Sequence, residues 1–122
     1  MTNILVVGNQ TVPVGEQNDI SIVGQTEDPT QTLELCRNLQ PDLVLMNAEA
    51  GTSSLNSAAQ IRRELPQIKV VLMTGKPETT VTDRAWKAGI QSYCCGEKRN
   101  KDLLSVIQGT MQGHGSYPGP VQ

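Results

Sequence analysis

The stretch Pro41-Asp42-Leu43-Val44-Leu45-Met46-Asn47 establishes the class of fold, because it is a short apolar run that ends in one polar side chain. Two similar apolar runs occur in the chain, at residues 4–8 and at residues 70–74. Runs of this kind, bounded by turn residues, are typical of strands that are buried on both faces of a parallel sheet. The carboxyl ends of such strands meet at one edge, where α/β proteins place their sites.

Strand and helix patterns alternate on either side of this run. We expect strands at residues 3–8, 20–24, 43–47, 69–74 and 92–95. We expect amphipathic helices, each with apolar residues three or four positions apart, at residues 29–40, 52–65, 78–88 and 100–112. This alternation predicts a doubly wound α/β fold, with a five-stranded parallel sheet in the flavodoxin-like (CheY-like) order 2-1-3-4-5.

The connection between the first two expected strands is unusually short. It has only about ten residues, including Pro13 and Gly15, whereas a crossover with its helix needs at least as many. We therefore expect the first helix of the fold to be shortened or missing. Its absence would leave apolar sheet surface exposed beside residues 100–112, where a second copy or another protein could bind. The alternative is that Val12 and Val14 fold over the gap.

The composition limits the classes of function. The 122 residues suit one domain at residues 1–112, followed by a flexible tail or linker at residues 113–122. A net charge of −2 gives no basic surface for direct nucleic-acid or membrane binding. We expect a reduced, cytoplasmic protein, because the three cysteines are an odd number and no signal peptide is visible. No metal site is expected, since the only histidine, His114, lies in a glycine-rich segment.

Four segments resemble the receiver domain of bacterial response regulators, in the branch that precedes a LuxR-type helix-turn-helix domain. They are ISIVGQTEDPTQTLELCRNLQPDLVLMN at residues 20–47, IRRELPQIKVVLMTG at 61–75, RAWKAGIQSYCC at 84–95 and DLLSVIQG at 102–109. The resemblance covers about residues 3–112. The tail also resembles the segment that, in that branch, leads to a DNA-binding domain.

The resemblance implies a phosphorylation site whose residues have been replaced. Receivers accept a phosphoryl group on an aspartate after strand three, bind Mg²⁺ with two acidic residues after strand one, and end strand five with a lysine. In this chain the acceptor position holds Asn47, the two acidic positions hold Gly8 and Asn9, and the lysine position holds Gly96. Only the hydroxyl residue that ends strand four in receivers is retained, as Thr74. An amide is a poor nucleophile, and Mg²⁺ needs anionic oxygens. We therefore expect a degenerate pseudo-receiver with no catalytic residue, no Mg²⁺ and no other cofactor.

Thr74 and Tyr93 match the pair that reports phosphorylation in switching receivers, where the hydroxyl moves toward the phosphate and vacates space for the aromatic ring. Without a phosphoryl group nothing shifts this equilibrium, so we expect Tyr93 to be a fixed surface residue. An exposed Trp86 would be a good contact residue, and partial burial against the sheet edge is the alternative. The candidate interface consists of Trp86, Tyr93, Leu104, Ile107 and Met111.

Three functions remain open. The favoured one is a non-enzymatic, phosphorylation-independent signalling module that contacts a protein partner or forms a homodimer, in transcriptional or two-component regulation. The second is a flavodoxin-like domain for a small ligand or nucleotide, with an anion held at Thr52-Ser53-Ser54, although no GxGxxG or Walker motif is present. The third is a receiver that is still phosphorylated at a non-standard site, with Glu49 and Lys98 as replacement groups.

Overall fold

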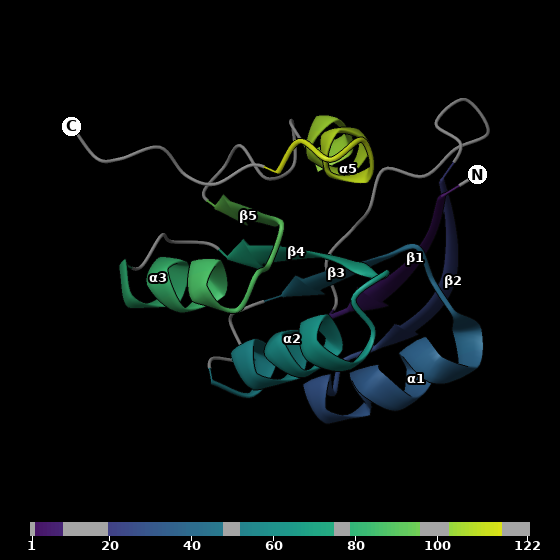
Figure 1. The fold of residues 1–122 in the computed structure, drawn as a ribbon. Helices are drawn as coiled ribbons and strands as arrows, with labels where there is room; N and C mark the ends of the chain where they lie inside the picture. Colours follow the sequence, from purple (N-terminus) through teal and green to yellow (C-terminus); the bar gives the residue numbers. More distant parts are fainter. Residues whose placement is uncertain (1, 9–19, 48–51, 75–78, 96–102, 116–122) are drawn as a thin grey trace.

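The computed structural model describes residues 2–8, 20–47, 52–74, 79–95 and 103–115. These residues include a five-stranded sheet in the order β2-β1-β3-β4-β5, and every neighbouring pair of strands is parallel (Figure 1). The strands are β1 (Thr2–Val7), β2 (Ile20–Thr26), β3 (Leu43–Asn47), β4 (Lys69–Thr74) and β5 (Ser92–Cys95). The predicted fold class is confirmed.

Helices cover both faces of the sheet. They are the 3₁₀ helix η2 (Pro29–Gln31) and the α-helices α1 (Thr32–Leu39), α2 (Thr52–Glu64), α3 (Thr79–Lys87) and α5 (Leu103–Met111). Figure 1 shows α1, α2 and α3 on one side of the sheet and α5 on the other. In the part of the chain that the structure describes, no helix is long and apolar enough to cross a membrane.

The predicted helix at residues 29–40 begins and ends as its sequence suggests. Asp28 caps η2, and its carboxylate accepts hydrogen bonds from the backbone N–H of Thr30, at 3.0 Å, and from the Thr30 hydroxyl. Pro29 follows at the first position, where a missing N–H costs nothing. The helical segment ends at Gln40, which adopts a left-handed conformation before Pro41.

Two apolar cores form because side chains alternate along each strand. On β1, Leu5 and Val7 face the core shared with α1, α2 and α3, whereas Ile4 and Val6 face the core shared with α5. All four are at most 1% exposed. Burial on both faces is the reason that the strands are continuously apolar rather than alternating.

The prediction of exposed apolar sheet surface beside residues 100–112 is wrong for β1 and β3, but on the edge strand β2 it holds for Ile22, which pairs with Ile4, lies on the same face and is 39% exposed. On the face that α5 covers, Ile4, Leu43 and Leu45 are 0% exposed, and Ile20 is 6% exposed. The predicted shortened or missing first helix, together with Val12 and Val14, lies outside the described residues.

The end of α5 is a Schellman motif. Gly113 has φ of +92°, and its N–H donates to the Thr110 carbonyl at 3.1 Å. The N–H of His114 donates to the Gly109 carbonyl at 2.7 Å, which completes the pair of hydrogen bonds that define this motif. At Gly115 a Cβ atom would collide with the carbonyl oxygen of Gln91, so the chain passes directly over the start of β5.

Candidate functional site

Three of the predicted site positions lie together at the carboxyl edge of the sheet. Val7 pairs with Met46, and Asn47 pairs with Met73. The residues at or just beyond the ends of β1, β3 and β4 are therefore Gly8, Asn47 and Thr74, on adjacent strands whose arrowheads point to the same edge (Figure 1). Asn9, Gly96, Glu49 and Lys98 lie outside the described residues.

Asn47 is half-buried, and its backbone is tied to the next helix. The hydroxyl of Ser54, which is fully buried, donates a hydrogen bond to the Asn47 carbonyl at 2.9 Å. This bond joins the end of β3 to the first turn of α2. Because the Ser54 hydroxyl donates its hydrogen to a backbone carbonyl, it cannot donate to an anion. The prediction of an anion site at Thr52-Ser53-Ser54 therefore has less support.

Gly8 adopts a backbone conformation that residues with a side chain rarely occupy. Its φ is +123°, its N–H donates to the Thr26 carbonyl at 2.7 Å, and its carbonyl accepts from Gln25 Nε2 at 3.0 Å. An aspartate at this position would be strained, because a Cβ atom disfavours positive φ. The sequence analysis did not identify Gln25 and Thr26 as hydrogen-bond partners of Gly8. Their position at the end of the neighbouring strand could have indicated this role.

The described residues at the ends of β1, β3 and β4 offer amide, hydroxyl and backbone groups. In the described ranges, no three residues of the types His, Cys, Asp and Glu lie close enough together to hold a metal ion. The nearby Asp28 is already engaged as a helix cap, and the hydrogen bonds from Thr30, first from its side chain and then from its backbone, lower the pKa of the Asp28 carboxyl. The described groups therefore lack the set of anionic oxygens that Mg²⁺ prefers.

The expected surface position of Tyr93 is wrong. Its side chain is 2% exposed and belongs to the core beneath α2 and α3. The cause is its place in the sheet: Tyr93 pairs with Leu72, so both side chains point to the same face. Thr74, two residues after Leu72, also points to that face and is 9% exposed.

The rest of the candidate interface divides into three groups. Trp86 on α3 is 70% exposed, which agrees with the exposed alternative and not with burial against the sheet edge. Ile107 is 1% exposed and belongs to the core beneath α5, so its assignment to a surface interface is wrong in this conformation. Leu104 and Met111 are partly buried against the same core.

The comparison with protein families agrees with this geometry. The family model described as response regulator receiver domain matches residues 9–108. Response regulator protein VraR of Staphylococcus aureus is 30% identical over 102 residues, which are 83% of this chain and 49% of that protein. The chain thus spans about half the length of the curated relatives that it matches.

Solved structures share the fold at low sequence identity. The isolated REC domain of RcsB from Salmonella enterica serovar Typhimurium in the apo form has a TM-score of 0.82 at 14% identity, with 97% of this chain and 93% of that chain covered. A DNA-binding response regulator of the LuxR family from Staphylococcus aureus has a TM-score of 0.79 at 20% identity, with 91% and 99% covered. Together with the family match, the relatives and the sheet order, these likenesses show that the chain belongs to the family of response regulator receiver domains.

Proposed function

We propose that this receiver domain signals without phosphorylation, through contacts with other proteins. The observation that carries the proposal is Asn47 at the end of β3, beside Gly8 just beyond the end of β1. Asn47 has an amide where the acceptor would have a carboxylate. Gly8 has a positive φ, a backbone conformation unsuited to a residue with a carboxylate side chain. Phosphoryl transfer needs a nucleophile and a bound cation, and neither is supported by these residues.

The buried Tyr93 supports a domain that is held in one arrangement. In the switching pair, the aromatic ring enters the core when the hydroxyl on β4 moves toward the phosphate. Here the side chain of Tyr93 is 2% exposed. A ring held in the core in this way supports one fixed arrangement of the Thr74–Tyr93 pair.

The output of the domain is a contact with a protein partner or with a second copy. Trp86 is the residue best placed for such a contact, because it is 70% exposed and tryptophan is enriched in the energetic centres of interfaces. We also propose that the whole protein regulates transcription in the cytoplasm and that the tail at residues 113–122 leads to a DNA-binding domain. Support for this comes from curated relatives that are about twice as long as this chain.

Fluorescence of Trp86, the single tryptophan, tests phosphorylation independence. The protein is titrated with beryllofluoride and Mg²⁺, and separately incubated with acetyl phosphate and Mg²⁺ before intact-mass measurement. We expect no saturable fluorescence change and no added phosphoryl group. The matched variant is Asn47→Asp, which restores the carboxylate but keeps Gly8, and which we also expect to remain without a response.

A saturable, Mg²⁺-dependent response of the unmodified protein would overturn the proposal in favour of a receiver with a non-standard site. A response of Asn47→Asp alone would show that Asn47 is the only group that prevents phosphorylation. The flavodoxin-like alternative predicts that the purified protein retains a nucleotide or flavin, which its absorbance spectrum would reveal.

A further inference from the structure

Charged side chains are distributed unevenly along the chain. Residues 1–50 contain seven acidic residues and one basic residue, a net charge of −6, whereas residues 51–122 contain nine basic and five acidic residues, a net charge of +4. The sheet order places β2, β1 and β3 of the first segment on one side and β4 and β5 of the second segment on the other. The two ends of the sheet therefore come from segments of opposite net charge.

The β2 end of the sheet is acidic. Glu27 and Asp28, which follow β2, and Glu34 in the first turn of α1 are exposed. Hydrogen bonds from the side chain and then the backbone of Thr30 lower the pKa of the Asp28 carboxyl, which keeps it charged. In the described part of the chain, none of these three carboxylates takes part in an ion pair. We call the surface formed by Glu27, Asp28 and Glu34 the acidic end.

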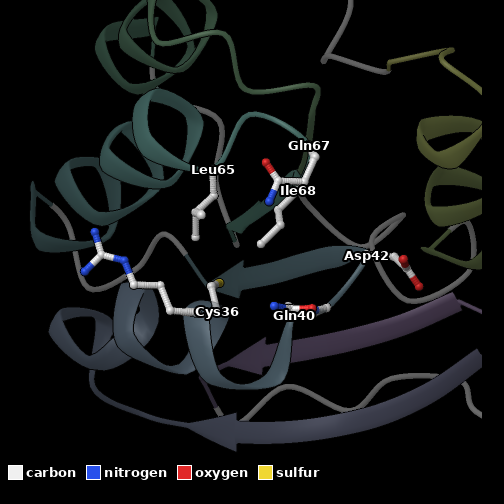
Figure 2. A pocket seen from close by; sticks show the side chains of 8 residues that line it. Cys36, Gln40, Asp42, Leu65, Gln67 and Ile68 are labelled. Atoms are coloured by element: carbon white, nitrogen blue, oxygen red, sulfur yellow. The ribbon is translucent and has the colours of Figure 1, made fainter.

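The other charged residues between positions 35 and 47 are engaged elsewhere. Arg37, the only basic one, forms an ion pair with Glu64 on α2, with 2.6 Å between Nη2 and Oε1. Asp42 accepts a hydrogen bond from the Asn3 backbone N–H at 2.8 Å. Figure 2 shows Asp42 at the margin of a pocket between the end of α1 and the turn that joins α2 to β4. Arg37 is thus already paired and does not neutralise the acidic end.

Helix α3, at the opposite end of the sheet, is basic and has an exposed tryptophan. Arg84 and Lys87 in its last turn are exposed, Asp83 is its only acidic residue, and Trp86 is 70% exposed. Within the described ranges, neither Arg84 nor Lys87 is in an ion pair. Figure 1 shows α3 and α1 on the same side of the sheet, with α2 between them. We call the exposed side of α3, with Arg84, Trp86 and Lys87, the basic face.

The composition of the basic face suits a contact with a negatively charged protein surface. Tryptophan and arginine are enriched in the residues that dominate binding energy, and surrounding charges select the partner. The acidic end of this same chain supplies the complementary charge. Two basic faces, or two acidic ends, would bring like charges together, which disfavours a symmetric contact. The distribution of charge therefore favours a contact between unlike surfaces.

We propose that the basic face of one copy binds the acidic end of a second copy, so that copies associate head to tail. Arg84 and Lys87 lie opposite the carboxylates of Glu27 and Glu34 of the second copy, and the contact covers Trp86. Because two different surfaces meet, each pair keeps one free surface of each kind, and further copies can add. The inference rests on the proposed signalling through protein contacts, since it names the partner of the Trp86 surface.

Sedimentation velocity at tens of micromolar protein measures the association. At low salt we expect species larger than the monomer, in a proportion that rises with protein concentration. At about 0.5 M NaCl we expect less association, because salt screens attraction between exposed charges. The emission of Trp86, the single tryptophan, should move to shorter wavelength as the protein concentration rises, since the contact removes its side chain from water.

Two double variants each remove the charges of one surface. They are Arg84→Gln with Lys87→Gln, and Glu27→Gln with Glu34→Gln, all at exposed positions where substitution should leave the melting temperature nearly unchanged. Each variant alone should associate at least about tenfold more weakly than the unmodified protein, because its contacts lose both charges on one side. An equimolar mixture should form a heterodimer that does not grow further, because one intact basic face and one intact acidic end remain.

The matched control is Arg63→Gln, which removes an exposed positive charge from α2, outside both surfaces, and should associate as the unmodified protein does. Two variants that fail to pair when mixed would overturn the head-to-tail arrangement, and so would association that neither double variant weakens. An unmodified protein that stays monomeric at low salt would overturn it as well. These outcomes leave phosphorylation independence untouched, because that is decided separately by the response to beryllofluoride and acetyl phosphate.

Discussion

Arg62 on α2 binds three carbonyl groups that belong to two segments of the chain. Its Nε atom donates to the Gly89 carbonyl at 3.0 Å, and its Nη1 atom donates to the carbonyls of Pro66, at 2.8 Å, and Ile68, at 3.0 Å. One planar side chain thereby joins the end of α3 to the turn between α2 and β4. A guanidinium is suited to this task, because its donors lie in a fixed geometry.

Replacement of Arg62 by alanine should lower the free energy of unfolding by about 2 kcal/mol, because several hydrogen bonds from a charged group are lost together. Urea denaturation followed by circular dichroism measures this loss. The control is Arg63→Ala, the same change at the neighbouring exposed position, which should alter stability by less than about 0.5 kcal/mol. Equal effects of the two substitutions would show that the hydrogen bonds of Arg62 do not stabilise the fold.

Cys36 makes stability depend on pH. Burial raises the pKa of its thiol from 9.0 to about 11, so the folded state holds this proton more tightly than the unfolded state. The resulting stabilisation is fully present below pH 9 and is lost as the pH rises toward 11. A shift of this size corresponds to about 2 to 3 kcal/mol, as an order of magnitude.

Comparison of the unmodified protein with Cys36→Ala isolates this contribution from that of other groups that titrate at high pH. The unfolding free energy of the unmodified protein should fall more steeply between pH 9 and about pH 11 than that of the variant. Parallel pH profiles of the two proteins would contradict the expected titration of Cys36.

At the scale of elements, apolar periodicity predicted the helices well where a whole stripe faces the sheet. On α2, Leu55, Ala58 and Ile61 are at most 6% exposed, as their spacing implied. On α1 the stripe is less regular, because Leu39 is 39% exposed. Its side chain reaches over β2, where a Cβ atom on Gly24 would lie 2.6 Å from Leu39 Cδ1, so a larger residue at position 24 would require the end of the Leu39 side chain to move.

The Schellman motif at the end of α5 should be sensitive to the residue at its left-handed position. Gly113→Ala places a Cβ atom where φ is +92°, and should reduce stability by about 1 kcal/mol. Ser105→Ala, at an exposed position of the same helix, is the matched control and should be close to neutral. Thermal unfolding distinguishes the two, and an unchanged melting temperature for Gly113→Ala would contradict the conformation described for this residue.

At the scale of the whole molecule, the sheet separates two cores, and both are well buried in the described strands. Exposed apolar side chains are therefore few in the described part of the chain: Ile22 and Leu39 are each 39% exposed, and Trp86 is 70% exposed. The proposed contact surface is centred on α3, which carries the most exposed of these side chains, and Ile22 is the exposed apolar residue on the α5 side of the sheet.

Trp86→Ala should leave stability nearly unchanged, because most of the side chain is in contact with solvent. If Trp86 lies at the centre of a self-association surface, the same variant should weaken the dimer at least tenfold, as measured by sedimentation equilibrium. Leu39→Ala, which alters a different exposed apolar position, serves as the comparison. A strictly monomeric unmodified protein at tens of micromolar would exclude the homodimer and leave a different protein as the partner.

Local patterns in the chain were enough to predict the class of fold, all five strands and the carboxyl edge where Gly8, Asn47 and Thr74 meet. This succeeded because strand and helix periodicity depends on neighbours two to four residues apart, and because parallel strands bring their ends to one edge. The domain boundary at residue 112, the absence of Mg²⁺ and the role of Asn47 stay predictions.

Other properties arose from contacts between segments far apart in the chain. Tyr93 and Ile107 were expected at the surface, yet both are buried, because the face that a side chain occupies depends on strand pairing and helix docking. The positive φ of Gly8 and the pocket between α1 and the α2–β4 turn have the same origin. They follow from packing in three dimensions, which the spacing of residues along one strand or helix does not encode.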